Sequence, residues 1–283
     1  MSAKVTLAFK CLIIVLSTFS IISLINKPST EDYKKNHGHP WEEYDPSFFF
    51  KYQRIDDIIA DADQHFKTSE KKTIRYYECI AEVIRKRFYH GYSYYSLAEN
   101  PIACVAGKFS FGHLSAIVIP DDIMKHPMAA CSQQAIVLME IFKKNGVNYR
   151  EVGFSHHFTT EAMIEGKWRY FDTDMEPNFQ HRRASLNELL LTKRFDKVYS
   201  YTGMDTADFH RMVENPYYGK INATPAPRVM LFHKLTFFLT STYFLFIALL
   251  VMIFSTVRFP KRVAYKNPGK QIYSPLHVIA TKS

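Results

Sequence analysis

The sequence predicts an α+β protein in which a helical layer packs on an antiparallel sheet, flanked by two membrane-spanning helices. Apolar residues recur at helical spacing within residues 54–88 and 131–144, and three short strand-like segments follow within 147–171. Two uncharged apolar runs lie towards the ends of the chain. With 283 residues, 47% of them hydrophobic, the chain can form one packed domain plus appendages.

The two apolar runs are the candidate membrane segments. Residues 11–25 lack charge, and Lys10 can reach the lipid interface, which lengthens this run to about 20 residues. No small-x-small cleavage site follows, so we expect an uncleaved anchor over residues 1–26 rather than a removed signal peptide. Residues 235–257 are also uncharged and long enough to span a bilayer, and we expect a transmembrane helix over 229–257.

The formal charge of +9 is concentrated at the two ends of the chain. Residues 1–26 and 258–283 carry eight basic residues and no acidic one, which leaves the middle nearly neutral and argues against a nucleic-acid partner. Basic residues collect on the cytoplasmic side of membrane segments. We therefore expect both ends in the cytoplasm, with a basic tail at 258–283. Residues 27–234 would lie outside it, in the periplasm if the cell is Gram-negative.

Between the membrane segments we expect a linker over residues 27–53 and one extracytoplasmic domain over 54–228. The linker is polar and lacks apolar periodicity. It contains His37 and His39, but histidines in such a segment are usually solvated, and we expect no metal there. The domain begins with a helix predicted over residues 54–66.

Helical spacing predicts a second helix that begins at a cap near Thr68 and Ser69 and runs to Phe88. Its apolar stripe is most simply part of the core. Residues 90–125 are then rich in aromatic side chains, which could line a substrate cleft or belong to the core. The sequence leaves both interpretations open.

Cys131 begins the next helical segment, residues 131–144. Apolar residues recur there at helical spacing, and two lysines followed by Asn145 and Gly146 mark its end. In the first turn of a helix, the unpaired N–H groups and the positive end of the helix dipole favour a thiolate, which is the reactive form of cysteine. A cysteine beside alanines could equally be a small buried core residue.

Three strands are predicted after this helix, over residues 147–154, 158–164 and 167–171. Glu165 and Gly166 can form a two-residue turn that makes the last two strands a hairpin. A slip of one residue in this turn would move every side chain to the other face of the sheet, so the positions below depend on the register.

The hairpin register brings a histidine and carboxylates together. If Ile164 pairs with Lys167, His157 lies opposite Asp174 and diagonal to Asp172, on the same face of the sheet. Diagonal neighbours are roughly 7 to 8 Å apart at the backbone, which lets an imidazole and a carboxylate form a hydrogen bond. The other ring nitrogen can then face a thiol.

At these residues the chain resembles the transglutaminase-like superfamily. The core of that family has a Cys with an Ala four positions on, a Gly that ends the helix, a His with a Glu four positions on in a strand, then Gly-x-Trp and an Asp. The matching residues here are Cys131, Ala135, Gly146, His157, Glu161, Gly166, Trp168 and Asp172. The resemblance covers roughly residues 72–178.

The resemblance implies a papain-like fold in which the helix that begins at Cys131 packs on an antiparallel sheet. It also implies that Cys131 is the nucleophile, His157 the general base and acid, and Asp172 the carboxylate that orients the imidazole. The spacing to Glu161 favours His157 over His156, which a strand would point to the opposite face.

Beyond these residues the sequence predicts smaller elements. Ser185, followed three residues later by a glutamate, is a capping box that predicts a short helix over residues 185–191. Residues 198–201 are predicted to form an edge strand. Residues 215–228 contain prolines, a glycine and a glycosylation sequon at Asn222, which indicates a linker into the second apolar run.

Cysteine usage adds one expectation. Of the four cysteines, Cys11 lies in the first apolar run. If the domain faces an oxidising space, Cys79 and Cys104 could form a disulfide, which would leave Cys131 as the free thiol.

Together these features predict a membrane-anchored extracytoplasmic thiol enzyme that cleaves a carboxamide or peptide bond through a Cys131 thioester, by acyl transfer or hydrolysis, without a cofactor. The expected partners are a peptide or protein substrate, the membrane and envelope-assembly proteins.

Two other functions stay open. A non-catalytic scaffold in cell-envelope or exported-polysaccharide assembly could keep the fold, and Ala129 and Thr159 depart from the family's usual residues. A metal site at Cys131 and His157 would lack further ligands at characteristic spacing.

Overall fold

The computed structural model describes residues 41–179 and 182–256, with the side chains of residues 243–256 excluded. The chain divides into two compact units, residues 1–243 and 244–283. Every strand described here belongs to the first unit, and so do all the described helices except the end of the last one.

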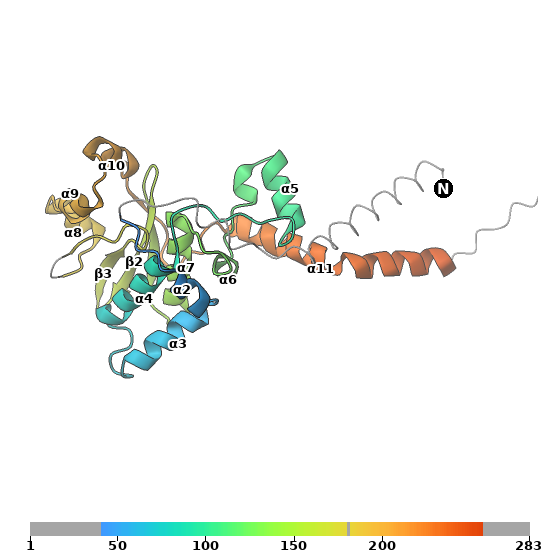
Figure 1. Ribbon diagram of the computed structural model, residues 1–283, viewed down its shortest axis with the longest axis horizontal. Coiled ribbons are helices and arrows are strands. Elements are labelled where there is room, and N and C mark those ends of the chain that lie inside the picture. The colour runs from blue at the N-terminus through green and yellow to red at the C-terminus, as the bar shows by residue number, and fades with distance from the viewer. Residues whose placement is uncertain (1–40, 180–181, 257–283) are drawn as a thin grey trace, which may run out of the picture. The chain divides into compact units, whose positions relative to one another are not determined.

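Helices precede and follow a small sheet along the chain (Figure 1). The helices are α2 (Pro46–Lys51), α3 (Ile55–His65), α4 (Ile74–Arg87), α5 (Pro101–Phe109), α6 (Pro120–Ile123), α7 (Cys131–Lys144), α8 (Leu186–Leu191), α9 (Phe195–Tyr199), α10 (Thr206–Met212) and α11 (Pro227–Thr256), with 3-10 turns η2 (Gly112–Leu114) and η3 (Ser200–Thr202). The strands are β1 (Tyr149–Gly153), β2 (Phe158–Ile164), β3 (Lys167–Phe171) and β4 (Tyr217–Tyr218).

The sheet is antiparallel, with the strand order β3-β2-β1-β4. Ile164 pairs with Lys167 across the β2–β3 hairpin, which confirms the predicted register. Glu165 and Gly166 both have positive φ, 52° and 73°. That backbone is typical of a type I′ turn, whose twist matches the twist of the strands. At the other side of the sheet, Gly153 lets a side chain of the short edge strand β4 lie directly on the backbone of β1.

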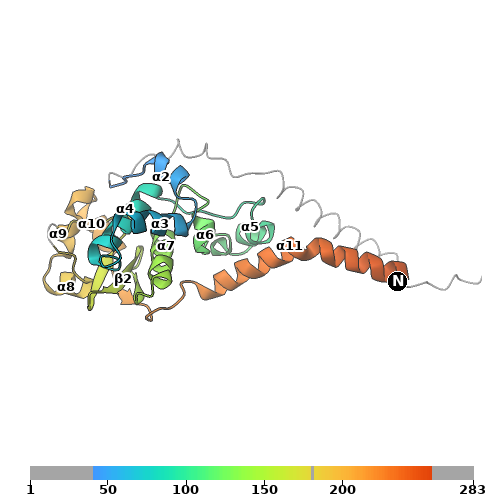
Figure 2. The same ribbon diagram turned by 90° about the horizontal axis from the view of Figure 1, so that it is seen from below.

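Each face of the sheet is covered by helices (Figure 2). On one face α7 packs against β1 and β2, and α3 and α4 pack against α7. This layer forms the larger core, which includes Ile58, Tyr77, Ile80, Val137, Leu138, Phe142, Ile164 and Phe171. On the other face α8, α9 and α10 bury a second cluster against Val152 and Tyr170. The predicted α+β class and the position of the cysteine helix on an antiparallel sheet are therefore confirmed.

The predicted edge strand at residues 198–201 is wrong. These residues belong to α9 and η3. Phe195, Val198 and Tyr199 are buried at positions i, i+3 and i+4, which is the spacing of one face of a helix rather than of a strand. The short helix predicted after Ser185 is confirmed as α8, and the Ser185 hydroxyl accepts the N–H of Glu188 at 3.1 Å.

Two predicted boundaries shift as well. The second helix, α4, begins after Thr73 rather than near Ser69, because Lys72 adopts a left-handed conformation and the Thr73 side chain caps the helix. The segment predicted as a linker over residues 27–53 contains α2, whose Phe49 is buried. The folded part therefore begins earlier than residue 54. The residues of that linker before Trp41 lie outside the described part of the chain.

α11 is a continuous helix over the segment in which a transmembrane helix was predicted. Among residues 41–179 and 182–242, whose side chains are described, we find no helix long and apolar enough to cross a bilayer. The anchor predicted over residues 1–26 and the basic tail over 258–283 lie outside the described residues.

Candidate active site

Cys131 is the first residue of α7, and its side chain is half-buried. The residue before it, Ala130, has no side-chain oxygen to cap the helix. No side-chain cap from Ala130 therefore occupies the N-terminal end of α7. The N–H groups of the first turn point towards this end, beside the thiol, and favour a negative charge there. The predicted position of Cys131 is confirmed.

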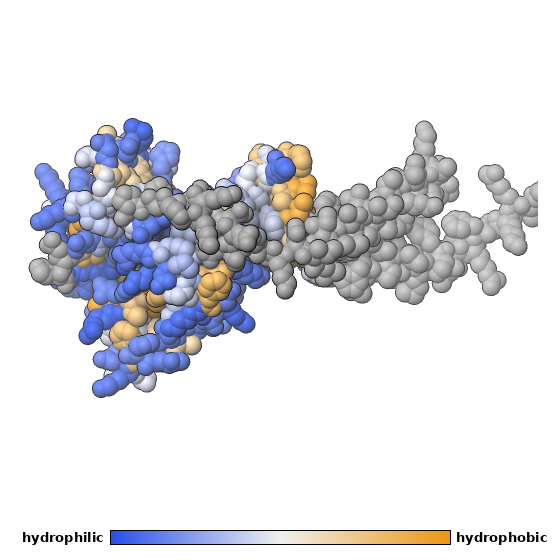
Figure 3. All heavy atoms as spheres, in the orientation of Figure 1, coloured by the Kyte–Doolittle hydropathy of each residue, from blue (hydrophilic) through white to orange (hydrophobic). Residues whose placement is uncertain are grey.

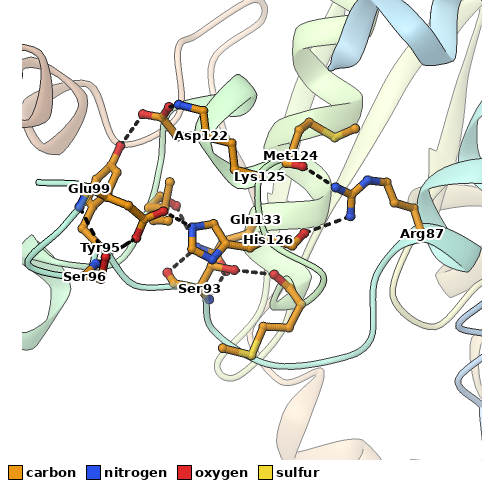
Figure 4. A network of polar contacts seen from close by, with 12 residues as sticks. Arg87, Ser93, Tyr95, Ser96, Glu99, Asp122, Met124, Lys125, His126 and Gln133 are labelled. Carbon is orange, nitrogen blue, oxygen red and sulfur yellow. Dashed lines mark hydrogen bonds and ion pairs between the residues drawn. The ribbon is translucent and has the colours of Figure 1, made fainter. Parts of the chain in front are cut away.

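The chain ahead of Cys131 is held by the buried amide of Gln133 (Figure 4). Its oxygen accepts the N–H of Ser93 at 2.8 Å and that of Ala130 at 3.2 Å. Its nitrogen donates to the carbonyls of Ser93 and Ile117 at 2.9 and 2.8 Å. One side chain in the first turn of α7 thus fixes three segments around the thiol.

Arg87 at the end of α4 holds the segment that leads into α7 from the other side (Figure 4). Its buried guanidinium donates to the carbonyl oxygens of Tyr52, Met124 and His126. Nearby, Glu99 forms an ion pair with His126 at 2.8 Å. These contacts satisfy backbone carbonyls that would otherwise be buried without donors, so their role is structural.

His157 directly precedes β2 and Asp172 directly follows β3, so the two residues face each other at the open end of the hairpin. His157 Nε2 lies 2.6 Å from Asp172 Oδ2, and both side chains are almost fully buried. The predicted His157–Asp172 contact is therefore present. His156, the competing histidine, is exposed.

The turn that carries His157 is fixed by backbone hydrogen bonds. The N–H of Phe154 donates to the His157 carbonyl at 2.8 Å, and the Phe154 ring stacks on the imidazole. The N–H groups of Ser155 and His156 donate to the carbonyls of Glu214 and Met212 at 2.9 and 3.0 Å. The end of α10 and the chain just after it therefore position the turn that carries the imidazole, and no sequence motif indicated this.

The carboxylate of Asp172 accepts four hydrogen bonds. Besides His157, its Oδ2 accepts the hydroxyl of Tyr199 at 2.8 Å. Its Oδ1 accepts the N–H groups of Asp174 and Met175 at 3.1 and 3.0 Å. Four donors fix the plane of the carboxylate and thus the direction in which it meets the imidazole. Tyr199 was missed because its segment was predicted to be a strand.

Electrostatics favour a protonated His157. Burial by itself lowers the pKa of the imidazole, but the charge of Asp172 and the charge and hydrogen bond of Cys131 outweigh burial and raise this pKa well above its usual value. Since Nε2 faces Asp172, Nδ1 is the ring nitrogen left for Cys131. The structure thus brings all three predicted site residues, Cys131, His157 and Asp172, together.

A second histidine–carboxylate pair lies beside this triad. Asp174 contacts His90 Nδ1 at 2.9 Å and accepts the Gln134 amide at 3.1 Å. The hydrogen bond to Asp174 raises the pKa of His90, although burial opposes it, and the nearby His157 also lowers it. The predicted register places Asp174 close to His157, but His90 comes from a segment in which no motif pointed to a single residue.

The glutamate and tryptophan of the motif have structural roles. Glu161 is fully buried, accepts two hydrogen bonds from Arg150 at 2.9 and 2.6 Å, and accepts the N–H of Leu186 at 2.7 Å. The Arg150 guanidinium lies over the rings of Trp168 and Tyr218, 4.4 and 3.9 Å from their centres. These residues tie β1, β2, β3 and β4 to α8, away from the thiol.

The predicted disulfide is not formed. Cys79 on α4 and Cys104 on α5 are both free thiols, as is Cys131. Burial raises the pKa of the Cys79 thiol and that of Cys104, which keeps both in the less reactive neutral form. Within the described residues, no group of three or more His, Cys, Asp or Glu side chains could hold a metal ion.

A cavity outside the triad is lined by residues of α8, α9, α10 and the chain after α10. It has a volume of about 560 Å³ and is lined by Leu190, Lys193, Phe195, Asp196, His210, Val213, Glu214, Asn215 and Pro216. None of these residues belongs to the triad. The candidate site therefore rests on the arrangement of thiol, imidazole and carboxylate and not on a cavity volume.

Comparison of the chain with protein-family models, with curated proteins and with solved structures found no match. The resemblance to the transglutaminase-like superfamily therefore rests on the residues named above and stays a prediction.

Proposed function

We propose that this chain is a thiol enzyme that cleaves a carboxamide or peptide bond through a Cys131 thioester. The observation that supports it most is the buried His157–Asp172 pair at 2.6 Å, with the imidazole next to a cysteine at a helix N-terminus. A core that needed only packing would have no reason to bury a charged pair beside a half-exposed thiol.

The reaction divides into two steps. The Cys131 thiolate attacks the carbonyl carbon, and the resulting oxyanion is stabilised by the N–H groups of the first turn of α7. Protonated His157 gives its proton to the leaving amine as the C–N bond breaks, which leaves a thioester on Cys131. His157 then takes a proton from water or from an acceptor amine, whose attack on the thioester restores the thiolate.

Asp172 contacts neither substrate nor thiol in this mechanism. It holds the imidazole in one orientation and stabilises the imidazolium, and Tyr199 in turn positions the carboxylate. Asp172 is therefore a positioning residue in this proposal, with Cys131 and His157 as the reacting groups.

The substrate class follows from the compartment that the sequence predicts. The proposed enzyme is membrane-anchored and extracytoplasmic, and it acts on a peptide or protein of the cell envelope. The apolar runs and the basic chain ends support this location.

The test is alkylation of the full chain by iodoacetamide, followed by intact mass, over roughly pH 5 to 9. We expect fast labelling at acidic pH in the wild type, no fast phase in Cys131→Ala, and a slower one in His157→Ala. Cys79 and Cys104 serve as internal controls because burial raises the pKa of both thiols. If the labelling rate of Cys131 instead follows the titration of an ordinary thiol, with a midpoint at about pH 8.5, the result would contradict the proposed thiol enzyme. It would favour the non-catalytic scaffold.

A further inference from the structure

Large apolar side chains are exposed where α5, η2 and the first half of α11 meet. Phe109 at the end of α5 is 77% exposed, and Phe111 just before η2 is 63% exposed. Four residues of α11 are exposed as well: Leu231, Leu235, Phe238 and Leu239. Figure 3 shows the apolar surface of α5. We call these six residues the apolar collar. Large exposed apolar side chains gathered on neighbouring elements mark an interaction site.

α5 and the first half of α11 are joined by specific contacts. The Asn100 amide, which caps α5, donates to the buried Thr236 hydroxyl at 2.8 Å. His233 Nε2 contacts the carbonyl of Leu114 at 2.8 Å, and the His233 ring packs on Tyr95, 4.8 Å between centres. The two parts of the apolar collar are therefore fixed to each other.

One face of this stretch of α11 lies against the domain, and the other face is exposed. His233, Thr236 and Phe237 face the domain, and the exposed residues of α11 lie on the opposite face by helical spacing. Phe109 at the end of α5 and Phe111 just before η2 add two exposed phenylalanines. The exposed apolar residues thus lie on separate elements, α5 and α11, and a lipid surface can cover both at once.

The charge distribution favours the same occupant. No acidic residue occurs within residues 100–119 or anywhere after Glu214. The exposed basic residues on these elements are Lys108, Arg228 and Lys234. Cations at the edge of an apolar surface can pair with lipid phosphates. Because these elements carry no carboxylates, they do not repel the negatively charged phosphates.

The sequence that follows the collar is also apolar. Residues 244–256 carry no charge, so the apolar residues of α11 are followed along the sequence by a longer apolar run. We propose that α5, η2 and the first half of α11 lie in the headgroup region of a lipid bilayer, with Phe109 and Phe111 in contact with the acyl chains. This membrane contact is independent of the chemistry proposed for Cys131.

The test uses tryptophan fluorescence of the full chain in vesicles of phosphatidylcholine and phosphatidylglycerol. Phe109→Trp and Phe111→Trp report on the collar. Leu191→Trp is the matched control, because Leu191 is 76% exposed but lies on α8. Emission from the native residues Trp41 and Trp168 is subtracted with the wild-type chain.

We expect bromine atoms near the headgroup end of the acyl chains to quench both collar variants more strongly than bromines near the methyl end. The control variant should show no quenching beyond the wild type. Far-UV circular dichroism and the Cys131 labelling rate, measured on each variant, establish that the fold is kept.

Two results would overturn the proposal. One is a chain that does not float with the vesicles. The other is collar variants that are quenched no more than Leu191→Trp, even if their emission is blue-shifted, since that would mean that protein rather than lipid covers the collar. Neither result bears on the thiol chemistry, which the alkylation experiment tests separately.

Discussion

His157 Nε2 lies 2.6 Å from Asp172 Oδ2, at the open end of the hairpin formed by β2 and β3. The two residues are fifteen positions apart in the sequence. Their contact follows from the hairpin register, since β2 begins just after the histidine and β3 ends just before the aspartate. The hairpin thus fixes the orientation of the imidazole that is proposed to act on Cys131.

Asp172→Asn should slow alkylation of Cys131 at about pH 6 by tenfold or more. The side-chain amide that replaces the carboxylate can donate a hydrogen bond to neutral Nε2, and it no longer stabilises the imidazolium that faces the thiol. The measurement is the pH profile of iodoacetamide labelling. Asp208→Asn is the matched control, since Asp208 is exposed and pairs only weakly with Arg211, 3.5 Å away. Equal labelling rates in both variants would show that Asp172 does not position His157.

Tyr199→Phe removes a buried hydroxyl that donates to Asp172 and contacts the Tyr170 hydroxyl at 2.9 Å. Hydrogen bonds to charged groups contribute about 2 kcal/mol, so we expect the free energy of unfolding to fall by about that amount. Urea denaturation measures it. Tyr201→Phe, which alters a half-exposed tyrosine, should change the free energy by less than about 0.5 kcal/mol. A Tyr199→Phe variant as stable as this control would contradict the proposed role.

The pKa of His157 is raised well above its usual value in the folded protein. The folded state therefore binds the proton more tightly than the unfolded state. The resulting stabilisation is fully present below the pKa of His157 in the unfolded state, about 6.5. It is lost as the pH rises through the pKa of His157 in the folded state. We expect the difference in unfolding free energy between wild type and His157→Gln to shrink over that range. Taking the difference removes the contribution of His90, whose pKa is also raised. A difference that grows with pH would mean that folding lowers the pKa of His157. That result would contradict the ion pair with Asp172.

Glu161→Gln should destabilise the fold by about 3 kcal/mol, because it leaves the Arg150 guanidinium without its carboxylate in a largely buried place. Glu140→Gln, which breaks the surface pair with Lys143, should cost less than about 1 kcal/mol. Thermal unfolding of both variants measures the difference. Labelling of Cys131 should stay unchanged in each, since Glu161 is proposed to hold the sheet rather than to act on the thiol.

Asp174→Asn should lower the pKa of His90 towards its usual value, because the hydrogen bond to Asp174 is the largest cause of the shift. Titration of the histidine ring signals by NMR measures this directly. The resonances of His157 should keep a raised pKa, since its partner Asp172 is intact. If the pKa of His157 changed and that of His90 did not, the result would contradict the assignment of Asp174 as the partner of His90.

The local sequence determined the elements around the triad. The stop signals after α7 and the two-residue turn at Glu165 and Gly166 are short-range patterns, and each predicted its element correctly. Because a hairpin register is set by its own turn, the contact between His157 and Asp172 could also be inferred without the tertiary structure.

The tertiary structure alone decided which distant residues surround the triad. His90, Tyr199 and the backbone at Met212 come from segments with no motif, and they reach the site only because separate elements pack together. Residues 198–201 form a helical segment because their apolar side chains are buried on one face against the sheet, and Cys79 and Cys104 remain unpaired on separate helices. Short-range patterns record turns, caps and periodicity, whereas contacts between distant segments depend on how whole elements pack.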